Sequence, residues 1–234
     1  MGKTLFILAV APLAAIAPAQ AQSGGIQVAP VLVEMAPERG FASLRVRNGR
    51  AHAAAFEADV YAWRQIDGED VLTPSDALLA APGVFEIAPG AEQVVRLAAP
   101  SPDPNRELAF RLILRELPTQ RRDGARLGFT LEMSLPVFVT PAGARAVLET
   151  RTEPRRLGTG LILTNAGAAH AQILSVSDMD AEALDAPRYL LAGGAAEIAL
   201  PARTNAVRMR LSEASGSQTE RIVHVTSGSR PSVR

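Results

Sequence analysis

Large apolar side chains occupy every second position over one long stretch, residues 127–139 (LGFTLEMSLPVFV). They are Leu127, Phe129, Leu131, Met133, Leu135, Val137 and Val139. A period of two places them on one face of a single extended strand, and an ordinary strand has only about 5–6 residues. Pro136 has no N–H to donate, which indicates a sheet edge or the end of the paired region. An apolar edge strand promotes aggregation unless a partner pairs with it.

The rest of the chain also predicts β-strands. Seventeen prolines and eighteen glycines separate short alternating runs at intervals of about 8–12 residues, as is typical of a β-sandwich. We predict strands over residues 25–33, 41–48, 54–65, 84–87, 91–97, 108–116 and 127–139, an immunoglobulin-like set. After residue 143 the pattern restarts, with shorter runs at 146–150, 160–165, 171–178, 196–200, 205–212 and 220–226.

These runs predict an all-β chain with two immunoglobulin-like β-sandwich domains, residues 24–142 and 143–228, and a mobile tail over residues 229–234. Ahead of them, Lys3, an apolar run and a small-residue site predict a signal peptide over residues 1–21, cleaved before Gln22. No later stretch approaches the roughly 20 apolar residues of a membrane helix. We therefore expect an exported chain without membrane insertion.

Several classes of function find no support in the composition. The chain has no cysteine for thiol chemistry, and 24 basic residues balance 24 acidic ones, which gives no case for nucleic-acid binding. The three histidines, His52, His170 and His224, lack metal-site spacing, and the acidic residues 178–182 lack the glycine and glutamate of an EF-hand. No serine lies in a GxSxG turn. We expect no metal, no cofactor and no enzyme activity, although two carboxylates could still meet in space.

Two arginines share one face of the strand predicted over residues 108–116. Phe110, Leu112 and Leu114 form its apolar face, while Arg111, Ile113 and Arg115 form the other. Such a mixed face either meets solvent or lines a cleft where a guanidinium binds a carboxylate through two hydrogen bonds. The residues alone favour solvent.

The sequence resembles the periplasmic pilus chaperones over most of the chain after the predicted signal peptide, best in the first domain. The resemblance is carried by residues 26–35 (IQVAPVLVEM), 44–48 (LRVRN), 87–97 (IAPGAEQVVRL), 109–118 (AFRLILRELP), 131–141 (LEMSLPVFVTP) and 189–201 (YLLAGGAAEIALP). The Pro-Gly-x-x-Gln-x-x-Arg and Arg-Glu-x-Pro elements stand in the family's order. The resemblance implies two immunoglobulin-like domains, a periplasmic location, and neither ATP nor metal.

In this family the last strand of the first domain is lent to a pilus or surface-fibre subunit that lacks one strand of its own fold. Aligning the end of residues 127–139 with the family motif assigns Leu127, Phe129, Leu131 and Met133 as the side chains that fill the subunit's groove. The chaperone then passes the subunit to an outer-membrane usher. The alternative is that the same face packs the core of its own domain.

The well-studied members anchor the subunit's terminal carboxylate with an arginine in the first strand and a lysine in the donor strand. Those positions are Leu32 and Pro136 here. The ending SLPVFV resembles the archaic, spore-coat-U-type branch of the family. If a carboxylate is still bound, Arg111 is the first candidate and Arg115 the second.

Two other functions stay open at this point. An exported fibre subunit or adhesin would carry a donor extension at its start, but residues 22–30 (QSGGIQVAP) are short and polar for one. An all-β hydrolase would need catalytic residues that converge in the fold. A free chaperone must also cover its apolar edge strand, and self-association through that strand is one way to do so.

Overall fold

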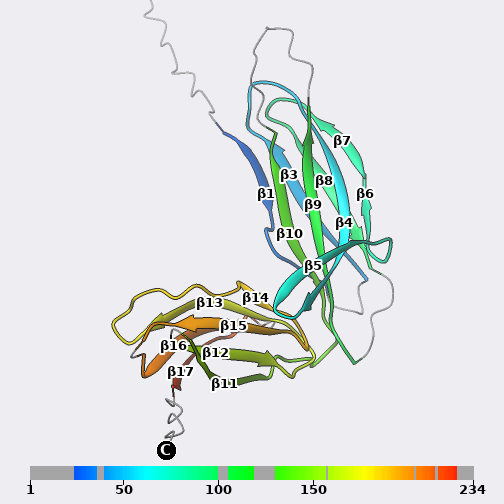
Figure 1. Ribbon diagram of the computed structural model, residues 1–234. Helices are drawn as coiled ribbons and strands as arrows, with labels where there is room; N and C mark the ends of the chain where they lie inside the picture. Colours follow the sequence, from blue (N-terminus) through cyan, green and yellow to red (C-terminus); the bar gives the residue numbers. More distant parts are fainter. Residues whose placement is uncertain are drawn as a thin grey trace, which may run out of the picture.

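The computed structural model describes residues 24–35, 40–99, 105–118, 130–156, 158–202, 204–213 and 216–225. All regular elements in these ranges are β-strands, which confirms the predicted all-β class. The strands form two separate groups, β1–β10 and β11–β17, which we call the first and second domain (Figure 1).

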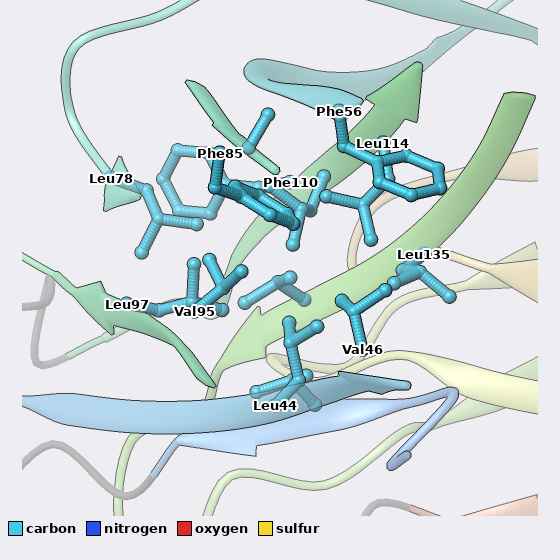
Figure 2. Close-up of a cluster of buried hydrophobic side chains, with 14 of the residues drawn as sticks. Leu44, Val46, Phe56, Leu78, Phe85, Val95, Leu97, Phe110, Leu114 and Leu135 are labelled. Carbon is cyan, nitrogen blue, oxygen red and sulfur yellow. The ribbon is translucent and has the colours of Figure 1, made fainter. Parts of the chain in front are cut away.

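The first domain is a sandwich of two sheets. One sheet has the order β1 (Ile26–Ala29), β3 (Phe41–Asn48), β8 (Glu92–Ala98), β6 (Leu79–Ala81). The other has the order β2 (Val33–Met35), β10 (Glu132–Val139), β9 (Leu108–Leu117), β4 (Ala54–Ile66), β5 (Glu69–Pro74), with β7 (Val84–Ile87) also on β4. Their inner faces enclose the core in Figure 2, where Phe56, Phe85 and Phe110 lie among aliphatic side chains.

The second domain also has two sheets. Strands β11 (Leu148–Arg155), β12 (Gly158–Asn165) and β15 (Ala195–Leu200) form one of them. Strands β14 (Tyr189–Leu190), β13 (Ala171–Asp178), β16 (Ala206–Glu213) and β17 (Gln218–His224) form the other. The core between them is aliphatic apart from Met209. The predicted boundary near residue 143 falls in the connection between β10 and β11.

The strand predicted over residues 25–33 is wrong as a single element. It is two strands, because β1 pairs antiparallel with β3 whereas β2 pairs parallel with β10 in the other sheet. Pro30 lies between them and cannot donate to a ladder, so the chain changes sheets there. The prediction also omitted β5, β6 and β14. The β4–β5 hairpin had a readable signal, because Asp67 and Gly68, with φ of 52° and 85°, form the Asp-Gly turn typical of hairpins.

The stretch of alternating apolar residues is described from residue 130 onward, so Leu127 and Phe129 lie outside the described residues. Leu135, Val137 and Val139 are buried in the core of the first domain. Core packing, the alternative stated for this face, therefore holds for the second half of the stretch.

A buried asparagine ends β3 in the first domain and β12 in the second, and in each case it holds the loop that follows. The amide of Asn48 donates to the C=O groups of His52 and Ile87, and that of Asn165 donates to those of Ala169 and Leu190. The side-chain oxygen accepts the backbone N–H two residues later in both cases, from Arg50 and from Gly167. Both side chains are fully buried. The two domains thus repeat one hydrogen-bonding device.

We predict that Asn165→Ala lowers the free energy of unfolding by about 2–4 kcal/mol, because it leaves several buried backbone groups without partners. The measurement is urea unfolding followed by far-UV circular dichroism. Asn205→Ala is the matched control, since Asn205 is exposed and should change stability by less than about 0.5 kcal/mol. Equal stability of the two variants would contradict this role of Asn165.

Candidate functional site

Half of strand β10 has an unpaired edge. It pairs antiparallel with β9 along its whole length. On its other side, β2 pairs only with Val137, Phe138 and Val139. Within the described part of the chain, residues 132–136 therefore face no neighbour on that side, which we call the free edge. The position of Pro136 at the end of the free edge confirms the prediction made from its missing N–H.

The hydrogen bonds at the two ends of β10 show which backbone groups the free edge presents. Glu116 donates its N–H to the C=O of Leu131 at 2.8 Å, and Thr140 donates its N–H to the C=O of Met35 at 3.2 Å. Backbone groups of odd residues thus point to β9, and those of even residues point to the β2 side. Glu132 and Ser134 present both N–H and C=O groups to the free edge. Pro136 has no N–H, and its C=O faces the N–H of Val33, where the pairing with β2 begins.

The two described members of the predicted donor set lie next to this edge. Leu131 and Met133 are half-buried, and Met133 packs against the core of the first domain. They occupy the same face as the fully buried Val137 and Val139, but at the end of the strand that β2 does not cover. The structure thus combines half-covered apolar side chains with unpaired backbone groups on one strand.

Arg111 lies directly across from Pro136 in the β9–β10 register. Its guanidinium carbon is 3.7 Å from the centroid of the Trp63 ring and 5.8 Å from that of Tyr189. Partial burial lowers the pKa of Arg111, while the charges of Asp70 and Tyr189 raise it. Among the described residues it forms no ion pair. The structure places Arg111 in a cleft rather than in open solvent.

The cleft contains a cavity of about 290 Å³ that both domains line. Trp63, Arg111 and the β4–β5 hairpin contribute from the first domain, and Arg188 and Tyr189 from the second. The Trp63 side chain is only 3% exposed, and its indole N–H is buried without an acceptor among the described residues. The lining thus combines Arg111 with the acidic residues of the hairpin, Glu69 and Asp70.

Arg115, the second anchor candidate, has very different surroundings. It contacts the carboxylates of Asp59 at 3.0 Å, Glu132 at 3.1 Å and Glu57 at 3.5 Å. Hydrogen bonds to Glu132 and then to Tyr61 raise the pKa of Arg115. Its donors already face carboxylates on an exposed surface, so the geometry favours Arg111 over Arg115 as a binder of a further carboxylate.

An aromatic cluster joins the two domains beside this cleft. Trp63 from β4 and Phe138 from β10 pack against Tyr189 and Leu191 of the second domain, and Leu32 packs on the same cluster. Gln65 adds two hydrogen bonds across the interface, to the C=O of Tyr189 at 3.0 Å and from the N–H of Leu191 at 2.9 Å. Because Phe138 belongs to β10, the second domain contacts the strand that carries the free edge.

A buried polar pair lies in the same interface. The Nδ1 atom of His170 is 3.1 and 3.0 Å from the two carboxylate oxygens of Glu107, which also accepts from the His170 N–H and the Thr140 hydroxyl. His170 and Glu107 are 1% and 7% exposed. The His170 ring stacks on Phe138 with centroids 3.6 Å apart. On neighbouring β2, desolvation raises the pKa of Glu34, whereas the charge of His170 lowers it.

Sequence reasoning missed Trp63, Glu107 and Tyr189, and it considered His170 only as a metal ligand. No local sequence pattern predicts that these residues meet. In the chain, 63 positions separate Glu107 from His170, and 126 separate Trp63 from Tyr189. Among the described residues, no group of three or more His, Cys, Asp or Glu side chains is arranged to hold a metal ion. No helix in the described ranges is long and apolar enough to cross a membrane.

Residues 25–145 match the family model of the pili and flagellar-assembly chaperones, PapD N-terminal domain. The chain belongs to this chaperone family. The matched region contains the free edge, Arg111 and the first-domain part of the interface. No curated protein sequence matches the chain.

Solved structures of pilus chaperones have the same fold. A chain of the CsuC–CsuE chaperone–tip adhesion subunit complex from archaic Csu pili of Acinetobacter baumannii is 18% identical with a TM-score of 0.69, covering 85% of this chain and 98% of that one. The Salmonella enterica complex of SafA pilin with the SafB chaperone gives 14% identity, a TM-score of 0.68 and coverage of 86% and 96%. The Escherichia coli chaperone DraB is 14% identical with a TM-score of 0.64, covering 86% of this chain and 97% of that one. These matches confirm the predicted two-domain β-sandwich of a pilus chaperone.

We predict that His170→Ala lowers the free energy of unfolding by about 3–5 kcal/mol, because removing one partner leaves the buried Glu107 carboxylate incompletely compensated. Chemical unfolding followed by tryptophan fluorescence measures the change, since the sole tryptophan, Trp63, lies in this interface. His224→Ala, at an exposed position, is the control and should leave stability nearly unchanged. If both variants unfold like the parent, the pair does not stabilise the interface.

Proposed function

We propose that this pilus-assembly chaperone acts in the periplasm by lending the stretch 127–139 to incomplete pilus or surface-fibre subunits and delivering them to an outer-membrane usher. The observation that carries the proposal is the free edge of β10 beside half-covered Leu131 and Met133. Two structural relatives are chaperones in complex with a tip subunit and with a pilin, which supports subunits as partners.

The free edge supplies what strand addition requires. Main-chain groups of Glu132 and Ser134 can pair with a subunit strand, and the apolar side chains on the core face can enter the subunit's groove. Burying one large apolar side chain contributes about 1.5–3 kcal/mol before the cost of ordering both partners. Leu127, Phe129, Leu131 and Met133 together form the proposed donor set. Binding of this kind needs no cofactor and no catalytic group.

The end of the free edge favours Arg111 as the carboxylate anchor. A subunit strand that runs parallel to β10 must stop near Pro136, because β2 occupies the edge from Val137 onward. Arg111 is the cross-strand neighbour of Pro136, and such neighbours have Cβ atoms about 4.5–5.5 Å apart. A terminal carboxylate that reaches Pro136 would thus meet a guanidinium one strand away from the position where well-studied relatives carry their lysine.

The proposal places the chain in the archaic branch of the family. The likeness to an archaic Csu chaperone and the replacement of both usual anchor positions, by Leu32 and Pro136, support this placement. A signal peptide over residues 1–21 with cleavage before Gln22 is part of the same proposal. The proposal also includes self-association through the free edge as one way in which the chaperone without a subunit covers this strand.

We predict that the tagged chaperone, purified from the periplasm of its own host, carries along small β-rich subunits and that Leu131→Asp abolishes this capture. A carboxylate at this position would enter the apolar groove of the subunit without a partner, which is costly. Mass spectrometry of the co-purified chains gives the readout. Leu79→Asp is the matched control, because Leu79 is 62% exposed and lies in the other sheet. Equal capture by both variants would rule out donation of this strand.

We predict that Arg111→Ala weakens binding of the captured subunit by about 10- to 100-fold, in line with the loss of a hydrogen bond to a charged group. Competition between each variant and a differently tagged parent for subunit that refolds from denaturant measures the relative affinity. Arg115→Ala is the matched control on the same strand and face, and it should change affinity by less than about threefold. Unchanged affinity of Arg111→Ala would exclude Arg111 as the anchor.

A further inference from the structure

The β9–β10 ladder ends on a side chain rather than on the main chain. The N–H of Leu131 donates to a carboxylate oxygen of Glu116 at 3.1 Å, while the N–H of Glu116 donates to the C=O of Leu131 at 2.8 Å. A carboxylate thus takes the place that the C=O of Glu116 would have in a regular antiparallel pair. Hydrogen bonds to a charged acceptor are stronger than those between neutral groups.

The carboxylate of Glu116 is itself held in place. Both of its oxygens contact the guanidinium of Arg50, one of them at 3.2 Å. The two side chains are 11% and 26% exposed, so the pair is mostly shielded from water. A forked contact between guanidinium and carboxylate fixes the orientation as well as the position of the carboxylate.

Arg50 is connected in turn to the core. Its N–H donates to the side-chain oxygen of Asn48 at 3.0 Å, and Asn48 is fully buried. Gly49 between them packs against Gly24, where an added Cβ would lie 2.9 Å from the Gly24 Cα. A continuous set of hydrogen bonds, which we call the Asn48–Leu131 relay, therefore runs from the buried Asn48 through Arg50 and Glu116 to Leu131.

We propose that Glu116 is a positioning residue, which fixes the register in which β10 presents Leu131 and Met133 to a subunit. The inference rests on the proposed strand donation. In a strand, a slip of one residue exchanges the two faces. Such a slip would present Glu132 and Ser134 in place of Leu131 and Met133, and the groove of the subunit would then meet polar side chains. Holding the donor strand in its bound register before the subunit arrives also lowers the ordering cost of binding.

The relay gives a role to the Arg-Glu-x-Pro element of residues 115–118. Its two charged residues both contact the start of β10, but on different atoms. Arg115 contacts the exposed Glu132 side chain, whereas Glu116 binds the backbone of Leu131. Surface ion pairs contribute little, so the register depends on Glu116 rather than on Arg115.

The test compares Glu116→Ala with Glu132→Ala, which removes a carboxylate from the same strand end without touching the relay. Amide hydrogen exchange, measured by NMR on the chaperone alone, reports whether Leu131 and Met133 stay held. We expect at least a tenfold loss of protection at Leu131 in Glu116→Ala and no change in Glu132→Ala. Glu116→Gln, which keeps an acceptor, should restore part of the protection.

Subunit capture from the host periplasm is the second readout. Glu116→Ala should capture several-fold less subunit than the parent, and Arg50→Ala should act in the same direction. The double variant should be little worse than either single one, because both act through one carboxylate. If Glu116→Ala does not fold, Arg50→Ala replaces it as the variant that should lose both protection and capture.

The outcomes separate this inference from the function on which it rests. If the parent captures no subunit, strand donation itself is wrong. If the parent captures subunits and Glu116→Ala captures them equally well, or if Leu131 keeps its protection in that variant, Glu116 does not set the register. A loss of thermal stability with unchanged exchange and capture would make the relay structural only.

Discussion

The short parallel pairing between β2 and β10 determines what the rest of the first domain can do. β2 has three residues, so it covers only the end of β10, and within the described ranges the main-chain groups at the start of that strand have no partner on this side. Pro30 makes this arrangement possible because it ends β1 and lets the chain cross to the other sheet. One strand therefore serves two purposes: Leu135, Val137 and Val139 complete the core, while Leu131 and Met133 remain only partly covered.

The opposite face of β10 connects the free edge to the second domain. Because side chains alternate along a strand, Phe138 points away from the core that holds Val137 and Val139, and it packs against Tyr189 and His170. The buried Glu107 and His170 pair lies beside this contact. The aromatic packing and the polar pair therefore hold the cleft in place relative to the strand that carries the free edge.

The sequence predicted those features that depend on local pattern. The period of two over residues 127–139, the missing N–H of Pro136 and the mixed face around Arg111 all follow from neighbouring residues, and so does the Asp67–Gly68 turn that the prediction overlooked. The division of residues 25–33 between two sheets depends on long-range pairing and has no such signal. The same holds for Trp63, and for Glu107 with His170, which meet only after both domains have folded.

Arg111 and Arg115 illustrate how little a pattern says about the surroundings of a charge. They lie four positions apart on one face, and the sequence treats them alike. Arg115 is surrounded by three carboxylates in contact with water, so a further carboxylate would have to displace them. Arg111 is partly desolvated, and the ring of Trp63 compensates its charge only in part. A carboxylate that enters the cleft would replace the hydration that the Arg111 guanidinium loses on folding. The guanidinium of Arg115 already has carboxylate partners, so a further carboxylate would gain little there.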